Sequence, residues 1–309
     1  MQKTLKRLVT QRDNKIVMNV VTGMHRSGTT YVGKILDACD QLDVFHEPFN
    51  RHFGISGINK NYPAVDMGYE LNTVDILKSI ESRQQLPFIR DCNKDKFTKK
   101  LARKIIGGKT EQQWRKIRLS HSLKEKQLVL KDPFLSMSTQ TLTKDLGVKV
   151  LFLCRHPGSV WASIKQMNWK MDLDNFFGDG FPINKQKDDL ATFCEVWNTI
   201  NLHNTTIEDA NYLFMTHEEL CIDPLGAFKQ VFDHFNLPLS EKANALIEDM
   251  TSGGQADKQS NKLHQFKRNS AEMVNLWQKK LSKEEIDYIY GNTTTRSLIE
   301  NLYGNSIQP

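Results

Sequence analysis

The sequence contains few cysteines, no long apolar run and no linker-like tract, and each absence narrows the class of protein. Its five cysteines lie far apart and include no C-x-x-C pair: Cys39, Cys92, Cys154, Cys194 and Cys221. Their odd number and apolar neighbours favour reduced, mostly buried thiols in a reducing compartment. No stretch approaches the ~18 consecutive apolar residues of a membrane span, and the basic N-terminal segment lacks the apolar centre of a signal peptide. We therefore expect a cytoplasmic chain without a transmembrane segment.

Composition and length indicate an ordinary globular chain. Of the 309 residues, 39% are hydrophobic and 25% are charged, which excludes the disordered, collagenous and membrane-spanning classes. No internal repeat, low-complexity tract or linker rich in proline, glycine and serine divides the sequence, and the polar stretch 251–261 is interpreted as a surface loop. We expect one domain over residues 1–309.

Short apolar runs alternate with helix-like sequence. Residues 15–22 (KIVMNVVT) have the pattern of a buried parallel strand, followed by the loop GMHRSGTT and by a helix that includes Tyr31. Three further strands are predicted at 127–130, 148–154 and 212–215. The alternation predicts an α/β, P-loop-like three-layer fold with a central parallel sheet flanked by helices.

The loop after the first predicted strand has the spacing of a phosphate-binding loop. Gly23 and Gly28 stand five residues apart, as in G-x-x-x-x-G, so backbone N–H groups and a helix N-terminus would face an anion. Thr29 replaces the lysine that a nucleoside triphosphatase needs, and a basic residue occurs inside the loop instead, at Arg26. The pattern favours an anion site without triphosphate hydrolysis. A glycine-rich turn without a ligand is the open alternative.

A second candidate anion site follows the predicted strand 148–154. Arg155 stands at the end of this strand and Ser163 lies eight residues later in the next helix, where both could face one phosphate. An arginine that caps the strand and a solvent-facing serine are the open alternative. Two anion sites at the carboxyl ends of parallel strands suit a nucleotide with two separate phosphate groups.

These segments together resemble a known family, the sulfotransferases that use 3′-phosphoadenosine 5′-phosphosulfate (PAPS). GMHRSGTTYVGKIL resembles the family's 5′-phosphosulfate loop, in the form found in its carbohydrate and tyrosylprotein branches. The family's 3′-phosphate motif is resembled by RHPGSVWASIKQ, and its Y-E-D-L segment by FMTHEELCIDPLGAFKQVFDHFNLPL. Its C-terminal tryptophan region is resembled by VNLWQKKLSKEEIDYI. The matches run from about residue 16 to 290 in the family's order, whereas 50–127 matches nothing recognisable.

The resemblance implies a PAPS site and, after transfer, adenosine 3′,5′-bisphosphate (PAP) as product. The residues that would form this site are His25, Arg26, Ser27, Gly28, Thr29, Thr30, Arg155 and Ser163. Residues 27–30 would hold the 5′-phosphate, and Arg155 and Ser163 the 3′-phosphate. Arg26 would stabilise the sulfuryl and bridging oxygens, and His25 would shape the loop. No metal-ligand cluster is evident in the sequence, so no metal is expected.

Two further elements carry the implied catalysis. Glu47, in FHEPF, resembles in placement the carboxylate proposed as general base in the tyrosylprotein branch, and Lys131, in VLKDPF, resembles a lysine that stabilises the transition state. His46 is the second candidate base, because a neutral imidazole could also accept the proton. Without the family, Glu47 could instead be a charge at a helix N-terminus or could pair with Arg51. Lys131 could be a solvated lysine at a strand end.

We expect in-line sulfuryl transfer from PAPS to a hydroxyl acceptor. A carbohydrate is the favoured class, since HEPF also resembles the F-E-P of carbohydrate sulfotransferases; a tyrosyl peptide or a small molecule stays open. The alternatives are a P-loop kinase of a small molecule, which the loop spacing supports and the missing lysine opposes, and a catalytically silent nucleotide-binding or scaffold protein. His217 and Glu218 are interpreted as structural, and Lys267 and Arg268 as an exposed basic pair.

Positive charge is concentrated in residues 94–126. This segment holds twelve lysines and arginines against three acidic residues, a local charge of +9, which leaves −3 of the total +6 for the rest of the chain. Phe97, Leu101 and Ile105 recur every four residues and predict an amphipathic helix, whose apolar face we expect on the core. Residues 50–127 are expected to form a variable, basic, mainly helical insertion on the acceptor side. The alternative for the basic stretch is that it forms a wall of the acceptor cleft that attracts an anionic glycan or an acidic peptide. Nucleic acid is not expected, because no basic groove interleaved with aromatics is present.

Overall fold

The computed structural model describes residues 17–90, 97–123, 126–171, 173, 176–177, 181, 183, 186–251 and 274–304. The polar stretch 252–261, Lys267, Arg268 and Cys92 lie outside these residues. Within them, no helix has both the length and the apolar character needed to cross a membrane.

The centre of the molecule is a five-stranded sheet in which every neighbouring pair is parallel. Its strands are β1 (Asn19–Gly23), β2 (Leu42–His46), β3 (Gln127–Lys131), β4 (Lys149–Cys154) and β5 (Tyr212–Thr216). They are arranged in the order β2-β3-β1-β4-β5. The four predicted strands and the parallel α/β architecture are therefore confirmed, whereas β2 was not predicted.

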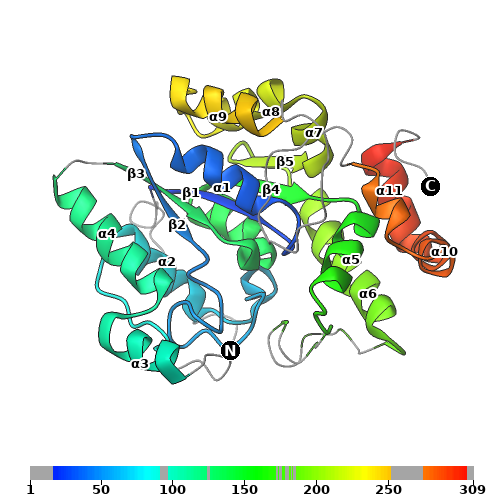
Figure 1. The fold of residues 1–309 in the computed structure, drawn as a ribbon, viewed down its shortest axis with the longest axis horizontal. Coiled ribbons are helices and arrows are strands. Elements are labelled where there is room, and N and C mark those ends of the chain that lie inside the picture. Colours follow the sequence, from blue (N-terminus) through cyan, green and yellow to red (C-terminus); the bar gives the residue numbers. More distant parts are fainter. Residues whose placement is uncertain are drawn as a thin grey trace, which may run out of the picture.

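The helices cover both faces of the sheet. They are α1 (Thr29–Asp37), α2 (Asn72–Glu81), α3 (Phe97–Ile106), α4 (Lys109–Leu123), α5 (Pro157–Gln166), α6 (Asp189–Thr205), α7 (His217–Ile222), α8 (Pro224–His234), α9 (Glu241–Thr251), α10 (Lys283–Gly291) and α11 (Thr293–Tyr303). In Figure 1, α8 and α9 lie above the sheet, and α5 and α6 lie below it. The result is the expected three-layer arrangement.

Successive strand residues point into two different hydrophobic cores. Val21 and Val44 pack in one core with apolar residues of α1, α8 and α9. Val20 and Phe45, their neighbours in the chain, pack in the other core with residues of α2, α4, α5 and α6. Burial on both faces requires apolar residues at consecutive positions, which is why continuous apolar runs identified four of the five strands.

The edge strand β2 is covered by a side chain rather than by another strand. Gln113 of α4 accepts a hydrogen bond from the His46 backbone N–H at 3.1 Å and donates one to the Val44 carbonyl at 2.8 Å. Two backbone groups at the outer edge of β2, the His46 N–H and the Val44 carbonyl, are thereby satisfied. Asp43, which interrupts the apolar pattern of β2, is 3.6 Å from Lys126.

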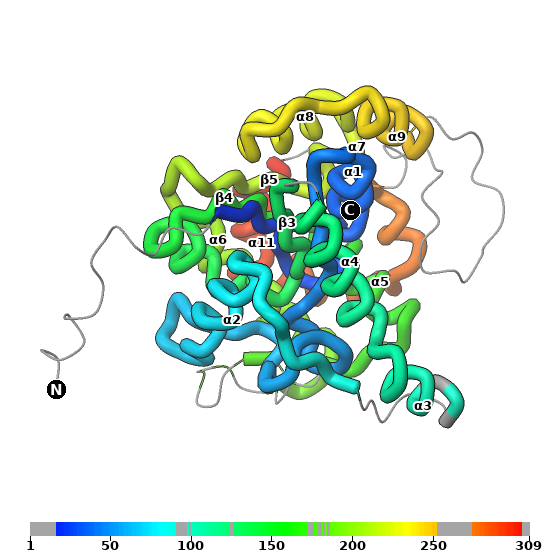
Figure 2. The backbone as a smooth tube through the Cα atoms, turned by 90° about the vertical axis from the view of Figure 1, so that its left-hand side faces the viewer, coloured from blue at the N-terminus to red at the C-terminus, as the bar shows by residue number. Residues whose placement is uncertain are grey.

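The helix predicted in the basic segment forms as α3, but its expected orientation is wrong. Leu101 and Ile105 are 51% and 70% exposed, whereas Arg103 is buried. Gly108 allows this inward placement, since a Cβ there would stand 2.7 Å from the Arg103 guanidinium. α3 lies at the edge of the molecule, as Figure 2 shows, and the side chain of Phe97 is outside the described structure.

The predicted helix 275–290 is divided into two elements. A 3₁₀ turn, Leu276–Lys279, comes first, and α10 starts only after Ser282. Ser282 and Glu285 form the expected capping box, and this cap explains why the helix begins there. Trp277 packs its ring against Gly158 and stacks on His156 at 4.6 Å between centroids.

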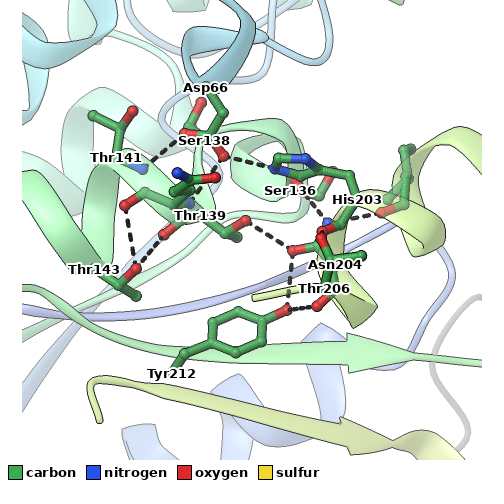
Figure 3. A network of polar contacts seen from close by, with 12 residues as sticks. Asp66, Ser136, Ser138, Thr139, Thr141, Thr143, His203, Asn204, Thr206 and Tyr212 are labelled. Atoms are coloured by element: carbon green, nitrogen blue, oxygen red, sulfur yellow. Dashed lines mark hydrogen bonds and ion pairs between the residues drawn. The ribbon is translucent and has the colours of Figure 1, made fainter. Parts of the chain in front are cut away.

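A polar network connects the segment before α2 to the body of the fold (Figure 3). Asp66 accepts hydrogen bonds from the backbone N–H groups of Gln140 and Thr141 at 2.9 and 2.7 Å, and its Oδ2 lies 2.7 Å from the His203 Nε2 atom. Ser138 donates a further hydrogen bond to the Pro63 carbonyl. Residues 63–66, which belong to the predicted acceptor-side insertion, are thus fixed to α6 and to the chain that follows β3.

Candidate active site

The candidate residues gather at the carboxyl edge of the sheet. The glycine loop follows β1, Glu47 follows β2, Lys131 ends β3 and Arg155 follows β4. The strand order reverses at β1, and ligands of open α/β sheets bind outside the carboxyl ends of the strands at such a point. The fold therefore brings together four segments that are spread over residues 23–155 of the sequence.

The glycine loop presents the N-terminus of α1. Gly28 caps this helix with a φ of +102°, and among the described residues no side chain caps the first turn. The hydroxyl of Ser27 is buried and lacks a hydrogen-bond partner within the described residues. A side chain on Gly28 would collide with the His217 ring. These features fit a phosphate, because free N–H groups and a hydroxyl are what its oxygens accept from.

His25 is held by aromatic residues rather than directed at a reacting group. Its backbone N–H donates to the Tyr62 hydroxyl at 3.2 Å, and its ring Nδ1 contacts the same hydroxyl. The ring stacks on Phe176 with centroids 5.9 Å apart. Burial, and then the charge of Arg26, lower the pKa of His25 to about 4. The imidazole is neutral and fixes the loop to Tyr62.

Arg26 connects the two candidate anion sites. Its backbone is left-handed, with a φ of +73°, and its Nε donates to the Ser163 Oγ at 2.8 Å. Arg155 donates to the Arg26 carbonyl at 3.2 Å, and the Arg155 Nε is buried without a hydrogen-bond partner among the described residues. Burial and the Arg155 charge lower the pKa of Arg26. Two cations held this close, with unsatisfied donors, favour an anion between them.

The segment around Arg155 is fixed from three sides. Trp197 donates its indole N–H to the Arg155 carbonyl at 3.1 Å. The next residue, His156, accepts a hydrogen bond from the Gly158 backbone N–H through its ring and donates its own backbone N–H to Glu218. Burial lowers the pKa of His156 to about 3, so its ring is a neutral acceptor. Glu218 acts structurally here, which agrees with its interpretation from the sequence.

Lys131 and Glu47 form a close ion pair. Lys131 is only 2% exposed, and its Nζ donates to the Glu47 Oε1 at 2.5 Å. Burial alone would raise the pKa of Glu47, but the Lys131 charge and hydrogen bonds from Lys131 and Asn50 outweigh it and lower the pKa. The carboxylate is therefore ionised at neutral pH. The alternative of a solvated Lys131 is wrong.

Asp132 holds the turn that carries Glu47. Its fully buried carboxylate accepts hydrogen bonds from the backbone N–H groups of Phe49 at 2.7 Å and Phe134 at 2.9 Å. Glu47 itself has a φ of +51° and donates its N–H to the Lys131 carbonyl at 2.8 Å. Burial raises the pKa of Asp132 to about 7. The K-D-P-F and H-E-P-F segments are thus joined through one buried carboxyl group.

His46 lies on the α1 side of β2. A Cβ on Gly33 of α1 would stand 3.3 Å from the His46 ring and 3.0 Å from the Lys131 side chain, so both pack against this helix. Burial, and then the charge of Lys131, lower the pKa of His46. The imidazole is adjacent to the ion pair but faces the helix.

Four residues of the site carried no recognised role in the sequence. Tyr62 anchors the glycine loop, Gln113 covers β2, and Asp132 holds the Glu47 turn. Trp169 is 42% exposed, and its ring lies 5.8 Å from the Arg26 guanidinium carbon and 5.7 Å from the His25 ring. Only Asp132 had a signal in the sequence, its place in K-D-P-F.

The fold and the site together define an α/β enzyme of the phosphate-loop type that acts on an anionic group donor. A profile of the sulfotransferase family matches residues 20–241, well over half of the sequence. The chain belongs to the sulfotransferase family, which confirms the resemblance found in the motifs. Membership makes the protein a sulfuryl-transferring enzyme and implies PAPS as donor and a hydroxyl-bearing acceptor.

Solved sulfotransferase structures are similar to this chain at low sequence identity, and one of them has a TM-score above 0.5. The sulfotransferase domain from the Synechococcus PCC 7002 olefin synthase has a TM-score of 0.51 and 15% identity, with 97% of this chain and 99% of that chain covered. The sulfotransferase domain from the curacin biosynthetic pathway has a TM-score of 0.48 and 14% identity, covering 93% and 98%. Mouse sulfotransferase SULT7A1 complexed with PAP has a TM-score of 0.43 and 12% identity, covering 95% and 87%. A search of curated protein sequences finds no significant match.

The role of Asp132 can be tested by replacing Asp132 with Asn. The amide can accept only one of the two backbone hydrogen bonds, so the Glu47 turn loses part of its support. We expect kcat for sulfuryl transfer to fall by about tenfold or more, since small misplacements of a reacting group are costly, while calorimetry shows unchanged PAP affinity. Asp43→Asn, at the opposite end of β2, is the matched control and should retain kcat. Equal kcat values for the two variants would contradict this role.

Proposed function

We propose that the chain is a single sulfotransferase domain that transfers a sulfuryl group from PAPS to a carbohydrate hydroxyl, with residues 50–127 forming the acceptor side. The observation that carries the proposal is the Lys131–Glu47 ion pair at 2.5 Å, which adjoins a phosphate loop containing Arg26. Sulfuryl transfer to a hydroxyl calls for a cation that stabilises the developing negative charge and for a base that accepts the hydroxyl proton. A buried lysine and an ionised carboxylate can take these two roles. We also keep the prediction of a cytoplasmic protein, which the four described cysteines, all free thiols, support.

The donor would lie along the carboxyl edge of the sheet. Ser27, Gly28, Thr29 and Thr30 would bind its 5′-phosphate through hydroxyls and the free N–H groups of α1. Arg155 and Ser163 would bind its 3′-phosphate. The unpaired Ser27 Oγ and Arg155 Nε support this assignment, because each could donate a hydrogen bond to a phosphate oxygen.

PAPS supplies an activated sulfuryl group whose departure leaves charge on a phosphate oxygen. Arg26 and Lys131 would neutralise the charge that develops on the sulfuryl and bridging oxygens. The hydrogen bond from Arg26 to Ser163 fixes the direction of the guanidinium. Lys131 is held in place by burial and by Glu47, so little reorganisation is needed when charge develops. In this proposal the protein's own cations suffice and no metal takes part.

Glu47 would accept the proton of the acceptor hydroxyl. Its carboxylate is 28% exposed, so an incoming hydroxyl can reach it, and its lowered pKa keeps it deprotonated at neutral pH. The ion pair also makes it a weak base, which suits a loose transition state in which the proton leaves late. His46 stays the second candidate, but its ring packs towards α1.

Trp169 supports a carbohydrate as the acceptor. Large exposed aromatic side chains beside a reactive group commonly serve as stacking surfaces, because the ring binds apolar faces while leaving polar edges free. The indole lies beside Arg26 and His25, at the point where the donor's sulfuryl group would be. A sugar ring presents an apolar C–H face with hydroxyls at its rim, and stacking on Trp169 would direct one hydroxyl towards Glu47.

Donor identity tests the proposed function against its two alternatives. We expect calorimetry to show binding of PAP and no binding of ATP, because Thr29 replaces the lysine that contacts β- and γ-phosphates. Incubation with sulfur-labelled PAPS and a panel of glycans, phenols and peptides should label a glycan. Preference for ATP would favour the small-molecule kinase. Binding of PAP without labelling of any acceptor would favour the catalytically silent protein.

The identity of the base can be tested with Glu47→Gln and His46→Gln. If Glu47 accepts the proton, Glu47→Gln lowers kcat by about 10²–10⁴-fold with PAP affinity retained, while His46→Gln changes kcat little. Single-turnover measurements on the preformed donor complex separate this effect from binding. A large loss in His46→Gln together with an active Glu47→Gln would assign the base to His46.

The stacking role of Trp169 predicts a graded series. Trp169→Ala should raise KM for a glycan acceptor by about tenfold, the equivalent of one aromatic contact, and Trp169→Phe should restore most of the affinity. Leu202, 44% exposed on α6, provides a matched surface control as Leu202→Ala. An unchanged KM in Trp169→Ala would exclude Trp169 from acceptor binding.

A further inference from the structure

A hollow lies in the acceptor-side segment, apart from the edge where the donor would bind. It has a volume of about 400 Å³ and is formed between α4 and the chain before α3. Three arginines line it, Arg90, Arg115 and Arg118, together with Glu111 and an apolar wall that includes Phe88. None of these residues belongs to the motifs that identify the family.

The hollow has a net positive charge, because its three arginines face a single acidic residue, Glu111. Glu111 is buried, and its two carboxylate oxygens accept hydrogen bonds from Arg90 at 2.5 and 3.0 Å and from Arg115. Hydrogen bonds from Arg90, and the charges of Arg90 and Arg115, lower the pKa of Glu111, so the carboxylate is ionised. Three guanidinium groups against one carboxylate leave an excess of two positive charges in the hollow.

Arg118 is the arginine that this ion-pair group does not use. Glu111, Arg115 and Arg118 follow one another at helical spacing along one face of α4. Arg90 and Arg115 both point their donors at Glu111, while Arg118 lines the same hollow from the next turn. Its planar fork of donors matches the geometry of a carboxylate or a sulfate.

Part of the lining of the hollow is apolar. Leu86 and Phe88 line the hollow with Trp114, whose indole N–H already donates to the Gln84 carbonyl at 3.0 Å. Trp114 stacks on Phe45 of β2 with ring centroids 4.7 Å apart. A ligand that fills this hollow therefore needs an apolar face beside an anionic group. A uronate or sulfated sugar ring combines the two in one rigid unit.

The walls of the hollow are continuous with the chain that carries Glu47. Ile55 pairs with Phe88 as a β-bridge and donates its N–H to the Pro48 carbonyl at 2.7 Å. On the other side, α4 holds the end of β2 through Gln113 and the His46 N–H. An acceptor bound here would contact the same structural unit that positions the candidate base.

We propose that this hollow is an acceptor subsite that binds the carboxylate or sulfate group of an acidic saccharide. The inference rests on the proposed function and names its substrate class: a glycan that already carries negative charge, with another of its hydroxyls at Glu47. The anionic group accepts hydrogen bonds from Arg118 and is attracted by the net positive charge that Arg90 and Arg115 add to the hollow. The sugar ring packs on Phe88.

Direct binding tests the subsite without requiring turnover. Hyaluronan and chondroitin sulfate hexasaccharides would be titrated into the full chain with PAP present, alongside a carboxyl-reduced hyaluronan hexasaccharide. At least one acidic probe should bind, and Arg118→Gln should weaken its binding by about 10- to 100-fold, the loss of a hydrogen bond to a charged group. The carboxyl-reduced probe should bind weakly to both proteins. Lys116→Gln, an exposed lysine on α4 outside the hollow, removes the same charge and should change the affinity little.

Several outcomes would overturn the subsite. They are the absence of binding by both acidic probes, equal losses in Arg118→Gln and Lys116→Gln, and tighter binding of a hexaglutamate peptide than of either saccharide. Failure of the proposed function is a separate result, since it would appear as absent PAP binding or absent labelling while the saccharide titration still reports on the hollow. If turnover is found, Arg118→Gln should raise KM for the acidic acceptor and leave kcat unchanged.

Discussion

The burial of a charged lysine at the end of the central sheet is the constraint on which the site depends. Removing an ammonium group from water costs several kcal/mol unless a partner of opposite charge compensates. Lys131 is 2% exposed and has that partner in Glu47. Glu47 in turn adopts a left-handed backbone that Asp132 supports through Phe49. Loss of any of these three groups leaves a buried charge or a buried N–H without its partner.

The cost of burying charge also explains why the histidines at the carboxyl edge of the sheet are neutral. His156 is buried and His25 and His217 are partly buried, and desolvation lowers the pKa of each. Their neutral rings act as spacers and hydrogen-bond acceptors beside Arg26 and Arg155, where protonated imidazoles would add repulsion. The positive charge of the site is therefore confined to arginine and lysine side chains.

Sequence patterns predicted the parts of the molecule that depend on local order. Apolar runs identified β1, β3, β4 and β5. The motifs and their spacing predicted that Arg26, Arg155 and Ser163 lie at one edge of the sheet. β2 was missed because Asp43 breaks its pattern, and the partner that makes Asp43 tolerable, Lys126, is distant in sequence. The inward face of α3 was also wrong, since helical periodicity shows which residues share a face but not which face meets the core. Tyr62 and Trp169 reach the site only through tertiary packing.

Helix α4 belongs to two structural units at once. Its Glu111, Arg115 and Arg118 line the arginine hollow, and its Gln113 replaces a neighbouring strand at the edge of β2. A rigid helix transmits a small rotation along its whole length. Through Gln113, α4 is hydrogen-bonded to the backbone of His46, one residue before Glu47. One helix, α4, therefore links the arginine hollow to the segment that carries the Glu47 carboxylate.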